Sequence, residues 1–435
     1  MMAMFINILI LSVMSLSRIL SISNGEKVII ACPEILLFRV FAVFRISFIM
    51  VFALNAQNIT NVDITQARFG IKNAEEIFKD FEIVPLETHK NGLLKVDIAT
   101  YYVTDKYIIG MNFTGPAYLF DRKTGSFIRQ ISSRGRGPDE YNGPFFNQYG
   151  FDEKNNIIFV GQGLHAWKSI NIETNKVELI INKPKDEGNN EIFGTARVPW
   201  FLKDGMYVSF CNNKTGIDKT KLIVFDNKGN LIKKYPNHLE YNTTGMTSMS
   251  SFPDLPGIFY YYNGNTYFKE CNYNDTVFRV SEKEMLPHIV FKLGNRQPSY
   301  YHQRNVDFNK GKYLIDFVYE TNSFILFNFT HHTETVEVLG ERGFKRGTVH
   351  SGYYNKKSGQ VFISSTSDLK SSGYTLSGIP VSFIPISINK NNEMIARIDA
   401  ADLVENMNKI GAQYRQKFRN IHEEDNPIVV IAKLK

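Results

Sequence analysis

The sequence predicts an all-β fold, and three observations support that prediction. Aromatic residues are frequent, with 34 Phe and 22 Tyr in 435 residues, and together with β-branched residues they suit the half-buried surface of a sheet. Short apolar alternations recur along the chain and are separated by turns rich in Asp, Asn and Gly. Helical periodicity is nearly missing before residue 402. An apolar content of 43% is enough to form a sizeable core.

Charge and cysteine content argue against several classes of protein. The net charge of +7 is a small excess on 50 basic and 43 acidic residues, and no long run of Lys and Arg occurs. Nucleic-acid binding is therefore not expected, because it needs a concentrated basic surface. The three cysteines, Cys32, Cys211 and Cys271, contain no C-x-x-C pair, so neither a zinc ribbon nor a thioredoxin-like site is indicated. A disulfide between Cys211 and Cys271 stays open, because the sequence does not give its geometry.

Residues 1–56 resemble an export signal. The stretch 35–54 is mostly apolar and carries Arg39 and Arg45, which are costly in a stable membrane span. As a signal peptide, it would have a basic end, an apolar stretch and a small-x-small cleavage site before Gln57. Two alternatives remain: an uncleaved membrane anchor, and lipidation at Cys32 after the sequence Ile-Ile-Ala. A translation start downstream of residue 1 would also explain the apolar stretch at residues 1–22.

Repeated hairpin patterns give the positions of the expected strands. Apolar alternation leads to a polar tip and then returns, as in residues 170–180 and 222–232. Tips with Asp and Gly favour tight turns, because Asp bonds its own backbone and Gly adopts positive φ. The other expected strands lie at residues 81–87, 93–98, 106–112, 118–131 (a hairpin), 150–160 (a hairpin), 205–210, 257–262, 265–269, 276–280, 288–292, 313–319, 322–328, 334–338, 347–353, 359–364, 381–387 and 426–435.

This pattern amounts to about two dozen strands, more than a single sandwich or barrel normally uses. Radial repetition fits better, and a six-bladed β-propeller starting at residue 57 would have about 63 residues per blade. A short C-terminal helix is expected at residues 402–418, before the final strand. We expect that strand to pair with the first strand of the fold and so close the ring without an open edge. The expected divisions are residues 1–56, a leader at 57–76 and the propeller at 77–435.

Three stretches resemble one family, the six-bladed β-propeller proteins exported by polysaccharide-degrading Gram-negative bacteria. Residues 77–88 are similar to the opening strand of that family, and residues 424–435 are similar to its closing strand. Residues 135–141, Gly-Arg-Gly-Pro-Asp-Glu-Tyr, are similar to its Gly-Arg-Gly-Pro-Gly-Glu-Tyr loop, with Asp139 in place of a glycine. The resemblance implies a propeller fold and export to the periplasm or cell surface. It implies no catalytic residues.

The loop at residues 133–141 is the first candidate for a binding site. Its glycines would let a ligand approach the backbone, Arg134 and Arg136 would grip carboxylate, phosphate or hydroxyl groups, and Tyr141 would offer a stacking face. Glu140 would complete the site. The alternative is a structural tie between blades, in which Arg136 pairs with Glu140 or with backbone carbonyls. We favour the tie, because a corner between two sheets needs such bonds.

Four further stretches carry candidate binding or metal groups. Trp167 would either stack on a sugar ring or pack in the core, and packing is favoured because large aromatic residues dominate cores. The cluster at residues 299–304 contributes Tyr301, His302 and Arg304, and the basic loop at 342–350 contributes Arg346 or is simply solvated. No metal is expected at His331 and His332, because adjacent residues on a strand point to opposite faces.

Recognition is the expected function, and no cofactor is expected. The catalytic motifs Gly-x-Ser-x-Gly and His-Glu-x-x-His are absent. We expect an exported, non-enzymatic binding or scaffold module that recognises a glycan, peptide or protein partner through loops on one face. The alternative is a propeller hydrolase or lyase, metal-dependent or not, with groups from separate blades meeting at the central channel. Contact with a membrane is expected only through the N-terminal segment, if it stays uncleaved.

Overall fold

The computed structural model describes residues 59–71, 73–94, 99–112, 116–133, 135–141, 150–162, 166–185, 199–203, 205–213, 215–242, 257–270, 273–302, 306–331, 348–364 and 373–435. They belong to one compact unit, residues 59–435. The expected export segment at 1–56, Cys271 and the expected strand at 334–338 lie outside the described residues. Among the residues that are described, no helix is long and apolar enough to cross a membrane.

Six small sheets, called blades 1 to 6 here, make up the unit. Blade 1 contains β4 (Ala99–Val103), β5 (Tyr107–Asn112), β6 (Ala117–Asp121) and β7 (Phe127–Ile131); blade 2 contains β8 (Gly150–Asp152), β9 (Ile157–Gln162), β10 (Ala166–Asn171) and β11 (Val177–Asn182); blade 3 contains β12 (Trp200–Lys203), β13 (Met206–Phe210), β14 (Thr220–Asp226) and β15 (Leu231–Pro236).

The other three blades each take an additional strand from the N-terminal segment. Blade 4 contains β16 (Gly257–Tyr262), β17 (Asn265–Glu270), β18 (Thr276–Val280), β19 (Met285–Lys292) and β1 (Thr60–Asp63); blade 5 contains β20 (Tyr313–Glu320), β21 (Phe324–His331), β22 (Thr348–Asn355), β23 (Gln360–Ile363) and β2 (Arg68–Phe69); blade 6 contains β24 (Tyr374–Leu376), β25 (Ile379–Ile388), β26 (Glu393–Ile398), β27 (Ile428–Leu434) and β3 (Phe78–Pro85).

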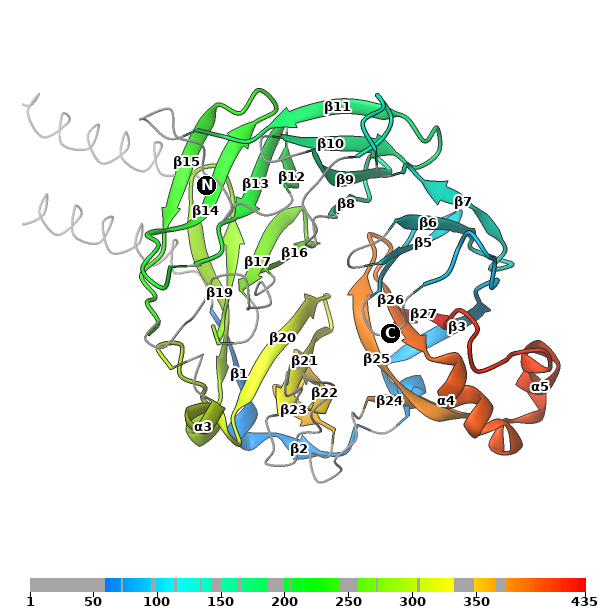
Figure 1. Ribbon diagram of the computed structural model, residues 1–435. Helices are drawn as coiled ribbons and strands as arrows, with labels where there is room; N and C mark the ends of the chain where they lie inside the picture. The colour runs from blue at the N-terminus through cyan, green and yellow to red at the C-terminus, as the bar shows by residue number, and fades with distance from the viewer. Residues whose placement is uncertain are drawn as a thin grey trace, which may run out of the picture. The chain divides into compact units, whose positions relative to one another are not determined.

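The blades stand in a ring around a centre, which confirms the predicted six-bladed β-propeller (Figure 1). Six apolar clusters fill the six junctions between neighbouring blades. Strand β27 shows how one sequence serves two junctions. Ile428, Val430 and Ala432 pack in the cluster shared with blade 5, whereas Val429 and Ile431 pack in the cluster shared with blade 1. The side-chain period of two therefore explains why this strand reads as a continuous apolar run.

Ring closure also follows the prediction. Strand β27 lies antiparallel to β3, with Val430 opposite Ile83 and Ile428 opposite Pro85. The C-terminal strand and an N-terminal strand thus share blade 6. Because β3 is the outermost strand of that sheet and ends at Pro85, the missing N–H of the proline leaves no gap in a central ladder.

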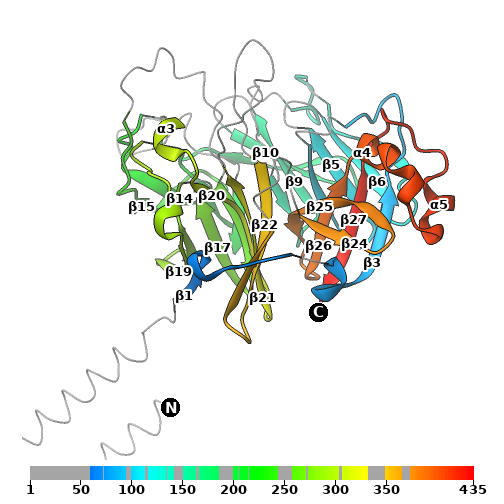
Figure 2. The same ribbon diagram turned by 90° about the horizontal axis from the view of Figure 1, so that it is seen from below.

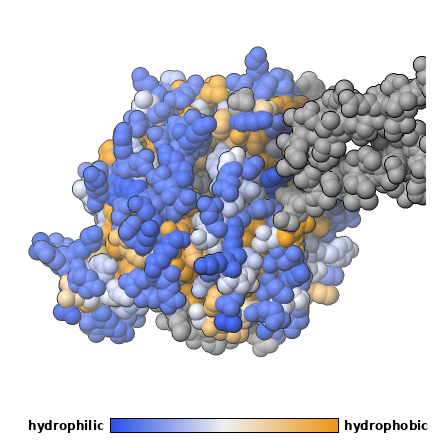
Figure 3. Space-filling model, turned by 180° about the vertical axis from the view of Figure 1, so that it is seen from behind, coloured by the Kyte–Doolittle hydropathy of each residue, from blue (hydrophilic) through white to orange (hydrophobic). Residues whose placement is uncertain are grey.

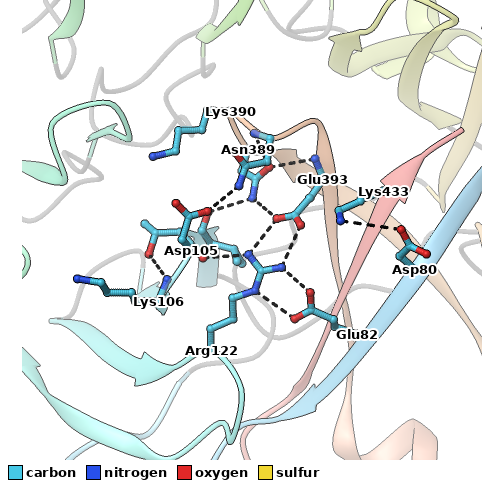
Figure 4. A network of polar contacts seen from close by, with 12 residues as sticks. Asp80, Glu82, Asp105, Lys106, Arg122, Asn389, Lys390, Glu393 and Lys433 are labelled. Atoms are coloured by element: carbon cyan, nitrogen blue, oxygen red, sulfur yellow. Dashed lines mark hydrogen bonds and ion pairs between the residues drawn. The ribbon is translucent and has the colours of Figure 1, made fainter.

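A polar network reinforces this closure on the side of blade 1 (Figure 4). Arg122, which follows β6, donates to both carboxylate oxygens of Glu393 at 3.0 Å and to the carboxylate of Glu82 at 2.6 and 3.1 Å. It also donates to the carbonyl of Thr104 at 3.1 Å. The side chains of Arg122 and Glu393 are 8% and 5% exposed, so the pair is largely removed from water. One residue of blade 1 therefore joins two strands of blade 6 from opposite ends of the chain.

The segment expected to be an irregular leader instead carries two short strands, which the sequence analysis missed. Strand β1 pairs in parallel with β19, and β2 pairs in parallel with β23. With β3, they run along the outer edges of three successive blades (Figures 1 and 2). Val62 and Ile64 are buried along the way. We call residues 59–77 the strap, because they cover sheet edges that would otherwise be open.

The helical elements are short. The structure shows α3 (Val306–Asn309), α4 (Ala400–Glu405) and α5 (Ala412–Phe418), with 3₁₀ turns at Ile64–Gln66, Ala74–Glu76, Gly294–Arg296 and Met407–Lys409. The single helix expected at 402–418 is thus two helices. The break falls where Ile410 is buried in the core of blade 6 and Gly411 has extended backbone at the start of α5. A packing contact overrides the helical pattern there.

Candidate functional site

Topology divides the connections between two faces of the ring. Apart from the added strands β1 and β2, neighbouring strands of one blade are antiparallel, so in blades 1 to 5 the turns after the first and third strands lie at one face and the remaining connections lie at the other. We call these the turn face and the loop face. Helix α3, in the connection from β19 to β20, belongs to the loop face and lies on the upper side in Figure 2. The described parts of two candidate loops, residues 133, 135–141 and 299–302, belong to loop-face connections, whereas residues 342–347 lie outside the described residues.

Within the described residues, the loop at 133–141 is bonded to itself. The carboxylate of Glu140 accepts the backbone N–H of Gly137 at 2.7 Å and the hydroxyl of Ser133 at 3.1 Å. These bonds hold the pKa of Glu140 below its usual range. A Cβ at Gly135 would overlap that carboxylate, so the glycine is required for the approach of Glu140. The side chain of Arg136 is exposed and makes none of these bonds.

Blade 2 also forms hydrogen bonds to the same loop. The ammonium of the buried Lys168, on β10, donates to the carbonyls of Pro138 at 2.9 Å and Glu140 at 2.5 Å. Asp139 accepts the backbone N–H of Val177 at 3.3 Å. The loop is therefore a tie between blades 1 and 2, as favoured from the sequence, but Lys168 and Glu140 make the bonds in place of the expected pair between Arg136 and Glu140. Arg134 lies outside the described residues.

Trp167 and Tyr141 serve packing. Trp167 is completely buried and stacks on Phe225 of blade 3 at 5.7 Å, so it cannot contact a ligand from solvent. Tyr141 is partly buried against the apolar cluster between blades 1 and 2. Both stacking on a ligand and packing in the core were expected possibilities for Trp167, and the structure shows packing, because its side chain lies in the junction between blades 2 and 3.

The second candidate cluster presents aromatic rings to solvent. Tyr301 and Phe308 are 53% and 52% exposed. His302 lies between them: its ring is parallel to that of Phe308, with centroids 3.8 Å apart and an angle of 6°. The ring of Tyr301 stands at 88° to that of His302, with centroids 5.0 Å apart. We call Tyr301, His302 and Phe308 the aromatic platform. Two of its three members were candidates from the sequence.

Hydrogen bonds from the buried Asn309 and from Asn242 hold the aromatic platform in place. The side chain of Asn309, 2% exposed, donates to the carbonyl of His302 at 2.9 Å and accepts the N–H of Ser299 at 3.0 Å. The carbonyl of Tyr301 accepts the N–H of Asn242 at 2.9 Å. This loop is thus joined both to α3 and to the loop that leaves blade 3. Less ordering entropy remains to be lost on binding when contact groups are fixed in this way.

A buried ion pair lies beneath the same loop. Lys221 of blade 3 pairs with Glu270 of blade 4, and their side chains are 5% and 3% exposed. Glu270 also accepts the hydroxyl of Tyr300 at 3.0 Å and the amide of Asn274 at 3.0 Å. Burial, followed by the nearby carboxylate, raises the pKa of Tyr300 well above its ordinary value. Tyr300 therefore stays neutral and donates its hydroxyl to Glu270, which fixes the chain directly before Tyr301.

Asp316 is the titratable group of most interest on an innermost strand. It occupies a bulge of β20, between Ile315 and Phe317, where the register with β21 shifts. Its carboxylate accepts the hydroxyl of Thr330, and burial raises its pKa to about 6 despite that bond and the ammonium of Lys269. Bulges often redirect a side chain next to a functional site, and a carboxylic acid with this pKa can exchange protons near neutral pH.

The structure says less about a metal site at His331 and His332 and about the candidates Arg304 and Arg346. Among the described residues, no group of three or more His, Cys, Asp or Glu side chains is placed to hold a metal ion. His332, Arg304 and Arg346 lie outside the described residues. Sequence reasoning missed Phe308 and Asn309, whose only signal was their closeness to the polar-aromatic run at 299–304. It also missed Lys221 and Glu270, which are 49 residues apart and meet only across a blade junction.

Comparisons with solved structures agree with this fold. One similar structure is the crystal structure of a candidate exported protein of Bacteroides fragilis NCTC 9343, with a TM-score of 0.59 and 16% identity over 87% of this chain and 100% of that one. A member of the DUF4221 family from Bacteroides vulgatus ATCC 8482 is similar with a TM-score of 0.51 and 10% identity, over 82% of this chain and 97% of that one. At these identities, the likeness shows the fold alone.

A comparison with curated proteins found no match. The model of one family, described as a domain of unknown function (DUF4934), matches residues 59–433. This match spans the strap, all six blades and nearly all of the closing strand. The chain therefore belongs to the DUF4934 family.

Proposed function

We propose that the protein is an exported, non-enzymatic binding or scaffold module that recognises a glycan, peptide or protein partner through its loop face. The observation that carries this proposal is the aromatic platform, in which two half-exposed rings lie in a segment that hydrogen bonds from Asn309 and Asn242 hold in place. Exposed apolar groups that the protein keeps rigid are typical of interaction sites. Elsewhere, the view from behind shows a surface on which hydrophilic residues predominate (Figure 3).

Export is supported by the N-terminal sequence and by the name of one structurally similar protein. The proposed location is the periplasm or cell surface of a Gram-negative bacterium. N-terminal sequencing of the protein from the exported fraction tests this part. A start at Gln57 supports a cleaved signal, whereas a retained segment or a lipid on Cys32 supports one of the two alternatives.

Binding is tested with the protein from residue 57 onward, immobilised and exposed to glycan arrays and to extracts of envelope proteins. The variant Phe308→Ala should lose the captured ligand. Phe69→Ala is the matched control, because Phe69 is an equally apolar ring, 68% exposed, but lies on the strap. Ligand capture that both variants retain equally would contradict a role for the aromatic platform. Turnover of a small substrate without any capture would reject the proposal.

Asp316 favours one second candidate function, that of a propeller hydrolase or lyase acting at the centre of the ring. A carboxylic acid with a pKa of about 6 on an innermost strand suits a general acid. Panels of esters, lactones and glycans test it with the wild type and Asp316→Asn. Activity that the variant loses would support catalysis, and inertness of the wild type on all three panels would exclude the candidate for those substrate classes.

A further inference from the structure

Turns from blades 1, 2 and 6 meet beside the network that closes the ring. The carboxylate of Glu153, in the turn after β8, accepts the backbone N–H of Lys390, in the turn between β25 and β26, at 2.7 Å. The side chain of Asn391, in the same turn of blade 6, donates to Asp105, in the turn after β4, at 2.7 Å. Figure 4 shows Asp105 and Lys390 in the same region as Glu393. Because blade 1 packs between blades 6 and 2, Glu153 joins two blades that are not neighbours.

The bonding of Glu153 is incomplete. Its Oε2 accepts the N–H of Lys390, whereas its Oε1 is buried and has no hydrogen-bond partner in the part of the chain that the structure describes. A buried carboxylate oxygen without a partner is most costly when it carries charge. The contact as observed therefore favours the neutral acid, because the ionised form would gain bonds from water by leaving it.

Charged groups on the neighbouring turns also disfavour ionisation of Glu153. Its pKa is raised to about 7, mainly by burial and in smaller part by the carboxylates of Asp105 and Glu393, against the lowering effect of the N–H and the charge of Lys390. The guanidinium of Arg122, the other cation of the closing network, is already bonded to Glu393. A charge on Glu153 would thus face two carboxylates across a short distance.

The remaining charged groups of these turns are held elsewhere. Lys106, beside Asp105, pairs with Glu173. The ammonium of Lys154 lies over the ring of Phe201 in blade 3, at 5.9 Å. The carboxylate of Asp152 accepts two N–H groups of its own turn, at 3.1 and 3.3 Å. These bonds leave Glu153 as the group whose ionisation most changes the contact between blades 2 and 6.

We propose that Glu153 is a pH-sensitive latch that holds the β25–β26 turn of blade 6 to blade 2. The neutral side chain keeps its bond to Lys390. When the side chain loses its proton, Asp105 and Glu393 repel it, so it turns toward solvent and releases the turn. This device is independent of the proposed binding function. It sets how firmly the blade that contains both chain ends is held.

The direction of the pH effect follows from linkage. The released side chain ionises at the ordinary pKa of a glutamate, whereas the latched one ionises at about 7. The latched state is therefore most favoured in acid. Its equilibrium with the released state falls about tenfold for each pH unit between the two pKa values and stays low above pH 7.

Hydrogen exchange of the Lys390 amide, resolved by mass spectrometry of overlapping peptides, tests the latch in the protein from residue 57 onward. Rates are corrected for the intrinsic effect of pH. Protection in the wild type should fall at least about tenfold between pH 5 and pH 8. The amide of Asn391 is the internal reference and should change little, because it bonds to Asn389 within the same turn.

Two variants of Glu153 separate the latch from other effects of pH. Glu153→Gln keeps an acceptor but cannot ionise, so Lys390 should stay protected at both pH values. Glu153→Ala removes the acceptor, so protection should be low at both. Glu173→Gln is the matched control, because this carboxyl group lies in the other turn of blade 2 and is 42% exposed; it should behave like the wild type.

Three results would overturn the inference. Equal protection of Lys390 in the wild type at pH 5 and pH 8 would show that the contact does not respond to protons. A loss of protection in Glu153→Gln that matches the wild type would assign the response to another group. An equal loss at Lys390 and Asn391 would show that the whole turn unfolds, which a latch at Glu153 does not require.

Discussion

Replacing Arg122 with methionine tests how the ring is held closed. Methionine fills a similar length but leaves Glu393, whose side chain is 5% exposed, without its charged partner. Removing one partner of a buried pair costs about 3–5 kcal/mol. The loss at Glu82 adds little, because that side chain is 44% exposed and water can replace the bond. We therefore expect Arg122→Met to lower the free energy of unfolding by about 4 kcal/mol.

Thermal unfolding, followed by calorimetry and far-UV circular dichroism, measures this loss. The unfolding entropy of a unit of this length is roughly 0.8 kcal/mol/K, so the melting temperature should fall by about 5 °C. Lys106→Met is the control, because the pair of Lys106 with Glu173 has side chains that are 70% and 42% exposed. The control should shift the melting temperature by about 1 °C or less. An Arg122→Met variant as stable as the control would refute the reasoning.

The pH dependence of this difference follows from Glu393. Burial alone would raise the pKa of Glu393, but hydrogen bonds from Arg122 and Asn389 outweigh it and hold the pKa below its ordinary value. A carboxyl group with a lowered pKa stabilises the fold above its unfolded pKa, and this contribution is lost as the pH falls through its folded pKa. The wild type and Arg122→Met should therefore approach each other in stability in acid. The double variant Arg122→Met, Glu393→Gln should recover part of the loss at neutral pH.

Three further predictions follow. Burial raises the pKa of Glu153 to about 7, and its Oε1 is buried without a hydrogen-bond partner. A carboxyl group with a raised pKa contributes stability that is lost as the pH rises through 7. The melting temperature of Glu153→Gln should therefore equal that of the wild type at pH 5 and exceed it at pH 8. Gly135→Ala should displace Glu140 and cost about 1–3 kcal/mol, seen as faster proteolytic cleavage at residues 133–141; unchanged cleavage would contradict the role of the glycine. A chain that starts at residue 71 loses the burial of Val62 and Ile64, about 3–5 kcal/mol in all, and should unfold at lower denaturant concentration than one starting at residue 57. Equal midpoints would show that the strap is dispensable.

The strands were the most predictable part of the fold, because their signal is local. The expected strand at 257–262 matches β16, and those at 276–280 and 313–319 match β18 and β20 to within one residue. Several strands escaped notice: the short strands β1, β2, β12 and β24, and also the longer strands β4 and β26. Segments as short as β1 and β2 do not show a clear alternation, and they become strands because a longer strand with an open edge lies beside them.

The candidate site was less predictable, because exposure and partners depend on residues far apart in sequence. Trp167 and Tyr301 are both aromatic residues near polar turns, yet one is fully buried and the other is half exposed. The difference arises because the side chain of Trp167 points from a strand of blade 2 into the junction with blade 3, whereas Tyr301 lies in a connection on the loop face. Nothing local in the sequence separates these two positions.

The sequence by itself determined the class of fold, most of the strand positions and the pairing of the chain ends, since alternation of apolar residues and turn chemistry act over a few neighbouring residues. The tertiary structure alone decided that Lys168 and Glu140 tie the Gly-Arg loop, that Arg122 joins both ends of the chain, and that Phe308 completes the aromatic platform. These contacts form across blade junctions or between loops. They are set by the closing of the ring, which brings distant residues to fixed distances.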